Sequence, residues 1–267
     1  DRIGNDFSYD LGFILSDSQA EITKYENPSG TLSDYYVGQK IGEIWGYETE
    51  GFYQSDTDVQ NHADQSKLGA NWAPGDIMYK DLDGNKKINN GSNTLDDHGD
   101  LKVIGNTTPR YQYGITANMS YKNVYLNVFF QGIGKRDFWP SSQPFWPVAT
   151  QYYNTQKWFV TDSWSEDNRD AYFARPIARE TKNQQKQTKY LQDASYCRLK
   201  NLTVGYDFPK SLLSFLHVAK AGVYFSAENL FEFTNVKGAY DPEAAGKNGT
   251  MVYPFQRTYS FGLNVTF

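Results

Sequence analysis

Alternation of apolar and polar residues is the dominant pattern near the start of the chain. Between residues 7 and 15 every odd position is aliphatic or aromatic, whereas the even positions are polar or glycine except at Ile14. A repeat of two residues is typical of a β-strand with one apolar and one polar face. The pattern therefore predicts a strand over residues 7–15.

The same alternation recurs later in the chain. Residues 111–119 and 124–130 alternate in this way and are separated by the short Lys122-Asn123 turn, so they predict a β-hairpin. Further strands are expected around Ile22 and over residues 41–53, 196–208 and 221–231. The apolar positions of the last predicted strand are Tyr259, Phe261, Leu263, Val265 and Phe267.

Short and long connections join the predicted strands. The turns at 122–123 and 209–217 are tight, whereas the connections at about 54–108, 134–192 and 234–252 are long and rich in Asp, Asn, Gly, Pro and Gln. Short turns at one end and long loops at the other are typical of outer-membrane β-barrels. About eight to ten strands of membrane-spanning length are expected. Because such long loops are awkward on a small ring, we expect an incomplete wall of a larger barrel.

A soluble β-sandwich would show the same alternation. Sandwich cores usually draw on Val, Ile and Leu, whereas Tyr and Phe are frequent here near the strand ends, as in the aromatic girdles of membrane barrels. The sequence thus favours an all-β fold, an antiparallel transmembrane β-barrel segment. The sandwich stays open as the alternative.

Composition narrows the class of protein. The 267-residue chain has no run of about 18 or more uncharged apolar residues, so no helical membrane span is predicted. A net charge of −5 gives no footprint for nucleic acid. The single Cys and three scattered His disfavour a disulfide framework, a cysteine-ligated zinc site and a Ser-His-Asp set. No enzyme is therefore expected, and a glycosidase would need carboxylates paired in a cleft.

The start of the chain suggests that it belongs to something larger. Asp1 is followed at once by a strand pattern, with no initiator Met and no signal peptide. We therefore expect the chain to begin inside a longer protein.

The most specific chemical motif lies at residues 81–88. Oxygen-bearing side chains stand at Asp81, Asp83 and Asn85, followed by the backbone carbonyl of Lys87 and an apolar residue, which is the beginning of a calcium-loop pattern. The sixth position of such a loop is normally glycine and is Lys86 here. The alternative is a metal-free turn rich in Asp, Asn and Gly.

Aromatic residues are concentrated in the 134–192 connection, which holds four of the six Trp. Exposed rings of this kind stack on a ligand or bury against a partner. The candidates for contact with substrate or partner are Trp139, Phe145, Trp146 and Trp158. Packing of the rings against one another is the alternative. The basic run of Lys182, Lys186 and Lys189 among Gln and Asn is expected to be solvated.

Several stretches of the chain closely resemble the SusC/RagA family of TonB-linked outer-membrane transporters. They follow the order of that family from about residue 30 to the end, and together they are specific. The matching stretches are residues 75–85 (GDIMYKDLDGN), 103–106 (VIGN), 109–111 (PRY), 193–206 (DASYCRLKNLTVGY), 228–231 (ENLF), 241–243 (DPE) and 253–267.

The resemblance implies a location and a set of partners. The chain would be the C-terminal part of such a transporter in the outer membrane of a Gram-negative bacterium, and it would supply less than half of a barrel of about 22 strands with a plugged lumen. The plug and the segment that contacts TonB would lie in the remaining N-terminal part. A SusD-like surface lipoprotein would cover the long loops. The family also places an Asp shortly before Val-Ile-Gly, which adds Asp100 to the possible Ca²⁺ ligands.

The function implied is TonB-dependent import of oligosaccharides, with oligopeptides as the second candidate for the cargo. Residues Tyr259, Phe261, Leu263, Val265 and Phe267 would then form the barrel assembly signal, since the last strand must pair with the first to remove both free edges. The rival from another class is a carbohydrate-binding β-sandwich module.

Overall fold

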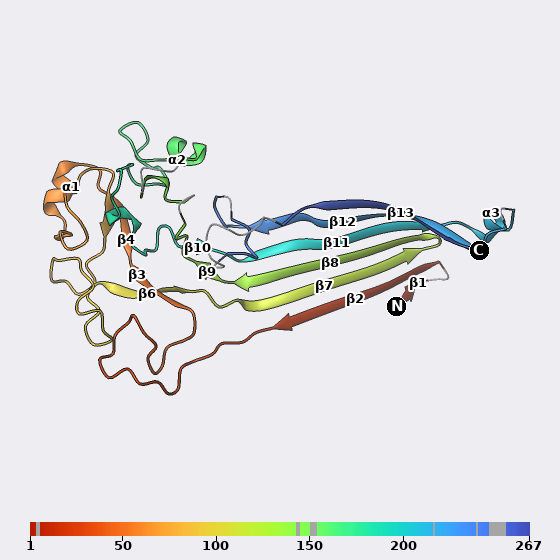
Figure 1. The fold of residues 1–267 in the computed structure, drawn as a ribbon, viewed down its shortest axis with the longest axis horizontal. Coiled ribbons are helices and arrows are strands. Elements are labelled where there is room, and N and C mark those ends of the chain that lie inside the picture. The colour runs from red at the N-terminus through yellow and green to blue at the C-terminus, as the bar shows by residue number, and fades with distance from the viewer. Residues whose placement is uncertain (4–5, 143–144, 150–153, 216, 239, 246–254) are drawn as a thin grey trace.

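A seven-stranded antiparallel sheet is the main element of the computed structural model (Figure 1). The structure describes residues 1–3, 6–142, 145–149, 154–215, 217–238, 240–245 and 255–267. The strands lie side by side in chain order. They are β1 (Arg2–Ile3), β2 (Phe7–Ser16), β7 (Arg110–Tyr121), β8 (Val124–Lys135), β11 (Tyr196–Asp207), β12 (Lys220–Thr234) and β13 (Thr258–Thr266).

The sheet is open among the described residues. The outer edge of β13 has no neighbouring strand, and β2 is paired on its outer side only with the two residues of β1. Every pairing between neighbours is antiparallel. The strand segments predicted at 7–15, 111–119, 124–130, 196–208, 221–231 and 259–267 are therefore confirmed.

The connections differ in length at the two ends of the sheet (Figure 1). At one end, residues 122–123 join β7 to β8, and a short segment with helix α3 (Lys210–Phe215) joins β11 to β12. At the other end, residues 17–109, 136–195 and 235–257 form the long connections. We call the described parts of 17–109 and 136–195 the loop domain.

The loop domain has small elements of its own. Its strands form three two-stranded ladders, β3 with β6, β4 with β5, and β9 with β10. The bounds are β3 (Glu43–Tyr47), β4 (Thr49–Phe52), β5 (Ile77–Tyr79), β6 (Leu101–Asn106), β9 (Asp137–Phe138), β10 (Gln192–Asp193), α1 (Asp56–Asn61), α2 (Lys157–Thr161) and the 3-10 turns Pro147–Ala149 and Lys182–Gln184. None of the helices in the described part of the chain is long and apolar enough to cross a membrane.

Two of the predicted strand segments do not join the main sheet: the segment at 41–53 does form strands, but in two-stranded ladders, and the segment around Ile22 forms no strand. Residues 41–53 form β3 and β4 inside the loop domain, and near Ile22 there is only an isolated bridge between Glu21 and Lys40. The side chains of Ile44, Tyr47 and Phe52 are buried there, so this segment is apolar because it contributes to a local core. The count of eight to ten long strands is accordingly too high for the described residues, whose main sheet has seven strands.

The two faces of the sheet differ in polarity. Direct cross-strand partners form one row of apolar residues across six strands and a neighbouring row of polar residues on the opposite face. The apolar row is Leu11, Ala117, Val128, Leu202, Ala227 and Tyr259, and the polar row is Asp10, Asn118, Asn127, Thr203, Ser226 and Ser260.

No second sheet covers the apolar face in the described part of the chain. Leu11 is 63% exposed and Phe261 is 84% exposed. A β-sandwich would bury this face against another sheet. The sandwich alternative is therefore not supported.

A β-bulge keeps the apolar side chains of β11 on one face. The register of β11 shifts between Leu199 and Asn201. Against β8, Lys200 is the extra residue, whereas against β12 the extra residue lies on β12, where Leu199 pairs with Phe231 and Asn201 with Glu228. In a regular strand Leu199 and Leu202, three positions apart, would point to opposite faces, because side chains alternate along a strand. With the bulge, Leu199 faces Phe130 and Leu202 faces Val128, both on the apolar face.

Aromatic residues form the core of the loop domain. The buried cluster joins residues from both of its long connections, so the two connections fold against each other as one unit. Its buried members are Tyr47, Phe52, Ile77, Tyr79, Ile88, Phe145, Trp146, Phe159, Trp164, Ala171, Phe173, Ala174 and Tyr190.

Candidate functional sites of the loop domain

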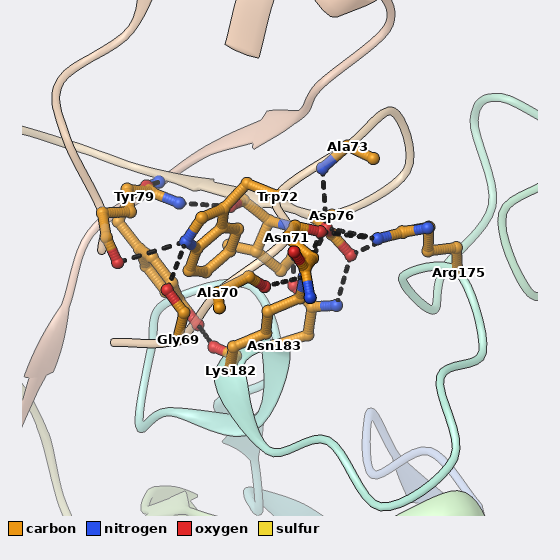
Figure 2. Close-up of polar contacts among 12 residues, drawn as sticks. Gly69, Ala70, Asn71, Trp72, Ala73, Asp76, Tyr79, Arg175, Lys182 and Asn183 are labelled. Carbon is orange, nitrogen blue, oxygen red and sulfur yellow. Dashed lines mark hydrogen bonds and ion pairs between the residues drawn. The ribbon is translucent and has the colours of Figure 1, made fainter. Parts of the chain in front are cut away.

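A buried carboxylate lies where the two long connections meet (Figure 2). The side chain of Asp76, which precedes β5, is fully buried. Arg175 donates to both of its oxygens at 2.8 and 2.9 Å, and Asn183 donates at 2.9 Å. The Nζ atom of Lys182 lies 2.9 Å from Oδ2 of Asp76. The backbone N–H of Ala73 also donates to Oδ2, at 3.0 Å.

These contacts determine the charge of the site. Burial by itself raises the pKa of Asp76, but the hydrogen bonds from Arg175, Asn183 and Lys182 outweigh burial, so that the pKa is lowered. Asp76 is therefore ionised at neutral pH. The cluster supplies no reactive group, and its evident role is to hold the two connections together.

The prediction that the basic run is solvated is wrong for Lys182. This side chain is 2% exposed, donates to the carbonyl oxygens of Ala70 and Asn71, and lies 4.8 Å from the centre of the Trp72 ring. Burial lowers the pKa of Lys189, with the charge of Lys237 contributing, and Lys189 lies over the ring of Phe52. Of the three lysines, only Lys186 is exposed. These contacts could not be predicted from sequence, because the Gln and Asn residues around the lysines indicate a solvated segment.

The calcium-loop motif forms a tight turn between β5 and β6. Oxygens of Asp81, Asp83 and Asp100 all lie within 4.8 Å of one another. Asp81 accepts hydrogen bonds from the backbone N–H groups of Gly84 and Lys86, both at 2.8 Å. Asp100 is fully buried and accepts from the backbone of Leu82 and Asn89.

The geometry of this turn fits a hard divalent cation in two respects. Lys86, at the position that is normally glycine, adopts φ of 60°, the left-handed conformation for which glycine is normally required. The donor set consists of carboxylate oxygens, which Ca²⁺ prefers. The Oδ1 atom of Asn85 accepts from the backbone N–H of Lys87 at 2.7 Å, and the carbonyl of Lys87 accepts from Asn89.

The four aromatic candidates occupy different environments. Phe145 is completely buried and Trp146 is 8% exposed, and both belong to the core of the loop domain. Neither has the exposed surface that contact with a substrate or partner requires, so for these two residues the structure corrects the prediction and supports packing among the rings. Trp139 and Trp158 are half-buried at the border of the same core.

Trp139 lines an open groove of about 530 Å³. Trp45 also lines it, together with polar and cationic side chains. The polar lining includes Lys67, Asn90, Gln185 and Lys186. The groove therefore combines aromatic side chains with side chains that can donate hydrogen bonds.

The C-terminal candidates lie on and just beyond β13. Tyr259, Phe261, Leu263 and Val265 pair with Ala227, Phe225, Val223 and Ala221, so all four point to the apolar face. Phe267 follows the strand and is 92% exposed. The structure thus brings four of the five residues into one apolar row at the free edge.

Sequence reasoning missed an ionic cluster on β11. Arg198 is 1% exposed and binds Asp241 at 2.7 Å and Glu243 at 2.8 Å, so the connection after β12 is held against the sheet. Lys200, the bulged residue, binds Glu243 at 2.9 Å. The run Asp-Pro-Glu at 241–243 was noticed as a motif, but nothing in the sequence indicated its partners.

Comparisons with known proteins give one consistent result. No protein-family model matches the chain. It is 32% identical over 243 residues to TonB-dependent receptor P3 of Formosa agariphila, a match that covers 86% of this chain and 22% of the receptor. It is 24% identical over 279 residues to the TonB-dependent receptor SusC of Bacteroides thetaiotaomicron, covering 99% of this chain and 25% of that protein.

Solved structures show the same fold. A structure of the RagAB peptide transporter matches all of this chain with a TM-score of 0.67 at 22% identity, over 28% of the transporter chain. A RagAB structure in the 'closed-closed' state gives the same values. The chain thus spans about a quarter of the length of the proteins that it resembles.

Proposed function

Since this chain belongs to the SusC/RagA family of TonB-dependent receptors, of which it is a partial segment, we propose that it forms part of the wall of an outer-membrane importer. The observation that carries the proposal is the single antiparallel sheet with one uncovered apolar face and one polar face. The relatives are receptors and transporters, which confirms the prediction that the chain is not an enzyme.

In the proposed barrel the apolar face contacts outer-membrane lipid and the polar face contacts the lumen. Side chains such as Phe13 and Leu263, each 65% exposed in this chain, are then buried in hydrocarbon. The free edges at β2 and β13 pair with strands from the rest of the transporter, because a bilayer offers no partner for unpaired backbone groups. The remaining N-terminal part holds the plug and receives the pull of TonB.

The partner that we propose is a SusD-like surface lipoprotein, which covers the loop domain as a lid. The long connections leave the same end of the sheet, and two of them, 17–109 and 136–195, form the loop domain there (Figure 1). The relatives support such a pairing, since RagAB structures are described as 'open-open' and 'closed-closed' states of a peptide importer.

The cargo that we propose is an oligosaccharide. The groove that Trp45 and Trp139 line also has amide and amino side chains in its lining, and the faces of sugar rings are apolar enough to stack on Trp. An oligopeptide is the second candidate, because the fold is also that of the RagAB peptide transporter.

We also propose that the turn formed by Asp81, Asp83, Asn85 and Lys87, together with Asp100, binds a structural Ca²⁺. The clustered carboxylates and the left-handed Lys86 support this assignment. The ion would offset the mutual repulsion of the carboxylates and stiffen the connection from β5 to β6.

The test uses the full-length transporter purified with its lid. Calorimetric titration with a neutral oligosaccharide series and with an oligopeptide series measures cargo class directly. Trp139→Ala and Trp158→Ala are compared with Val160→Ala, a change at an exposed apolar residue of α2. We expect the transporter to bind oligosaccharides, and we expect Trp139→Ala to weaken this binding while the lid still co-purifies. If only peptides bind, the cargo is an oligopeptide. If Trp139→Ala causes loss of the lid, Trp139 belongs to the lid interface.

A further inference from the structure

The geometry of β1 points to an intramolecular docking surface at the β2 side of the loop domain. We propose that the connection preceding β1 in the full-length transporter packs on an exposed apolar patch formed by Tyr25, Tyr35 and Val37, which we call the edge patch. This inference rests on the proposed function, because it takes the chain to be one part of a longer transporter.

The register of β1 fixes the path of the preceding strand. Arg2 pairs with Ser8 and Ile3 pairs with Phe7, and Asp1 and Tyr9 exchange backbone hydrogen bonds. In an antiparallel ladder the two paired numbers keep a constant sum. The residue immediately before Asp1 therefore faces Asp10, and the seventh residue before Asp1 faces Ser16.

This path leads to the loop domain. Seven further residues carry the preceding strand along β2 to Ser16, the end from which the 17–109 connection starts. At that end Asp17 is held by Arg110, which donates to it at 2.5 and 2.6 Å. The connection that leads into the preceding strand then starts at the Ser16 end of β2, from which residues 17–42 run along the β2 side of the loop domain (Figure 1).

The surface that it meets there is apolar. Tyr25 is 41% exposed, Tyr35 is 50% exposed and Val37 is 58% exposed, and the first two rings touch edge to face at 5.6 Å. Tyr36, between the last two, is buried and donates to Glu43, so the patch is presented by an anchored segment.

Polar contacts surround the edge patch and give it the character of an interface. The hydroxyl of Tyr25 donates to Asp34 at 2.8 Å, and Asn27 donates to the carbonyl of Tyr35 at 3.0 Å. Apolar centres with satisfied polar rims are typical of protein interfaces. The occupant that we infer is the upstream connection, because the strand register leads it to the Ser16 end of β2, where the segment that carries the edge patch begins, and the relatives extend well beyond this chain.

Site-directed cross-linking in the full-length transporter tests the register. In a Cys197→Ser background, Gly12→Cys is combined with a cysteine at the third residue before Asp1, a pair that exchanges no backbone hydrogen bonds and so brings the Cβ atoms close. A side chain at Gly12 meets only Thr116 at an ordinary 3.7 Å. We expect a disulfide in high yield under mild oxidation. The matched control combines the same upstream cysteine with Phe13→Cys, which points to the other face and should remain reduced.

A second measurement tests the edge patch itself. Tyr35→Asp with Val37→Asp is compared with Val160→Asp, which removes an equally exposed apolar residue from α2. In the transporter without its lid, the double variant should increase proteolysis of the upstream connection and the control should not.

Two results would overturn the inference. A barrel that assembles in the outer membrane but forms the Phe13 cross-link, or neither cross-link, would refute the register while leaving the proposed function intact. An edge-patch variant that behaves as wild type alone and loses only the lid would assign the patch to the lipoprotein.

Discussion

Arg175 donates two hydrogen bonds to Asp76, at 2.8 and 2.9 Å, although the two residues are 99 positions apart in the sequence. Strands β7 and β8 lie between them in the chain. The pair therefore fastens the connection that precedes this hairpin to the connection that follows it. Lys182 and Asn183 strengthen the same contact from the second connection.

Asp76→Asn should destabilise the loop domain by about 3–5 kcal/mol, because it leaves the buried ammonium of Lys182 without its ion-pair partner. Thermal unfolding and limited proteolysis of the full-length protein measure the effect. Glu166→Gln breaks an exposed ion pair with Arg169 and serves as the control, with an expected change below about 1 kcal/mol. If Asp76→Asn and Glu166→Gln destabilised the protein equally, burial would not be the reason why the Asp76 ion pair matters for stability.

The contribution of Asp76 should also depend on pH. Its pKa in the folded protein is lowered below the ordinary value of 3.8, so the stabilisation is present above that value and is lost as the pH falls through the folded pKa. Protease sensitivity of wild type and Asp76→Asn, measured from neutral to strongly acidic pH, should therefore differ at neutral pH and converge in acid. A constant difference across the range would show that the carboxylate charge is not the cause.

Deleting Thr203 should prevent assembly of the wall. Without that residue Leu202 and Val204 become direct neighbours, so one half of β11 turns its apolar side chains to the polar face. Deleting Lys200 is the matched control, because it removes the bulge but leaves Leu199 and Leu202 two positions apart, both on the apolar face. The amount of heat-modifiable barrel in outer membranes distinguishes the two deletions. Equal losses for both would contradict a requirement for side-chain alternation in β11.

Leu263→Arg should lower the yield of assembled barrel. Arg on the lipid-facing side costs about 2–4 kcal/mol at the middle of the bilayer. Asn264→Arg is the matched control, because Asn264 follows Leu263 in β13, pairs with Gly222 and points to the polar face. The same heat-modifiability assay applies, and similar losses for both variants would argue against a lipid-facing Leu263.

Chelation should loosen the turn at Asp81 if it holds Ca²⁺. Proteolysis between residues 76 and 100 should increase with a chelator, and Asp81→Ala with Asp83→Ala should reproduce that increase without one. Asp96→Ala removes an exposed carboxylate from the same connection outside the cluster and should leave cleavage unchanged. Cleavage that is indifferent to chelation would favour the metal-free turn.

The sheet could be predicted from sequence because its signal is local. Phe7 to Leu15 alternate along one strand, and so do Tyr259 to Phe267, so no knowledge of their neighbours was needed. The segment at 41–53 has the pattern of a wall strand although it lies in the loop domain, because a strand of a small buried ladder is as apolar as a strand of a wall. The two-residue repeat alone does not distinguish a strand of the main sheet from a strand in the loop domain.

The contacts of the loop domain could not be predicted because they are non-local. Lys182 stands among Gln and Asn, which suggests solvent, yet it is buried by Trp72 and Asp76 from the other connection. Phe145 and Trp146 carry the same aromatic signal as Trp139, and only the fold separates buried rings from those at the groove. The Asp81 turn was visible because its ligand candidates are close in sequence.

The shared core of the loop domain also helps to fix the register between β7 and β8. If the register between β7 and β8 shifted by two residues, each side chain would still point to the same face of the sheet. The alternation of apolar and polar residues therefore disfavours such a shift only weakly. The same shift would displace the start of the 136–195 connection by about 7 Å. Arg175 would then miss Asp76, and Phe145 and Tyr190 would lose their places in the core that they share with Ile77. The loop domain can therefore form its core in only one register of β7 against β8, and in this way it stabilises that register of the sheet.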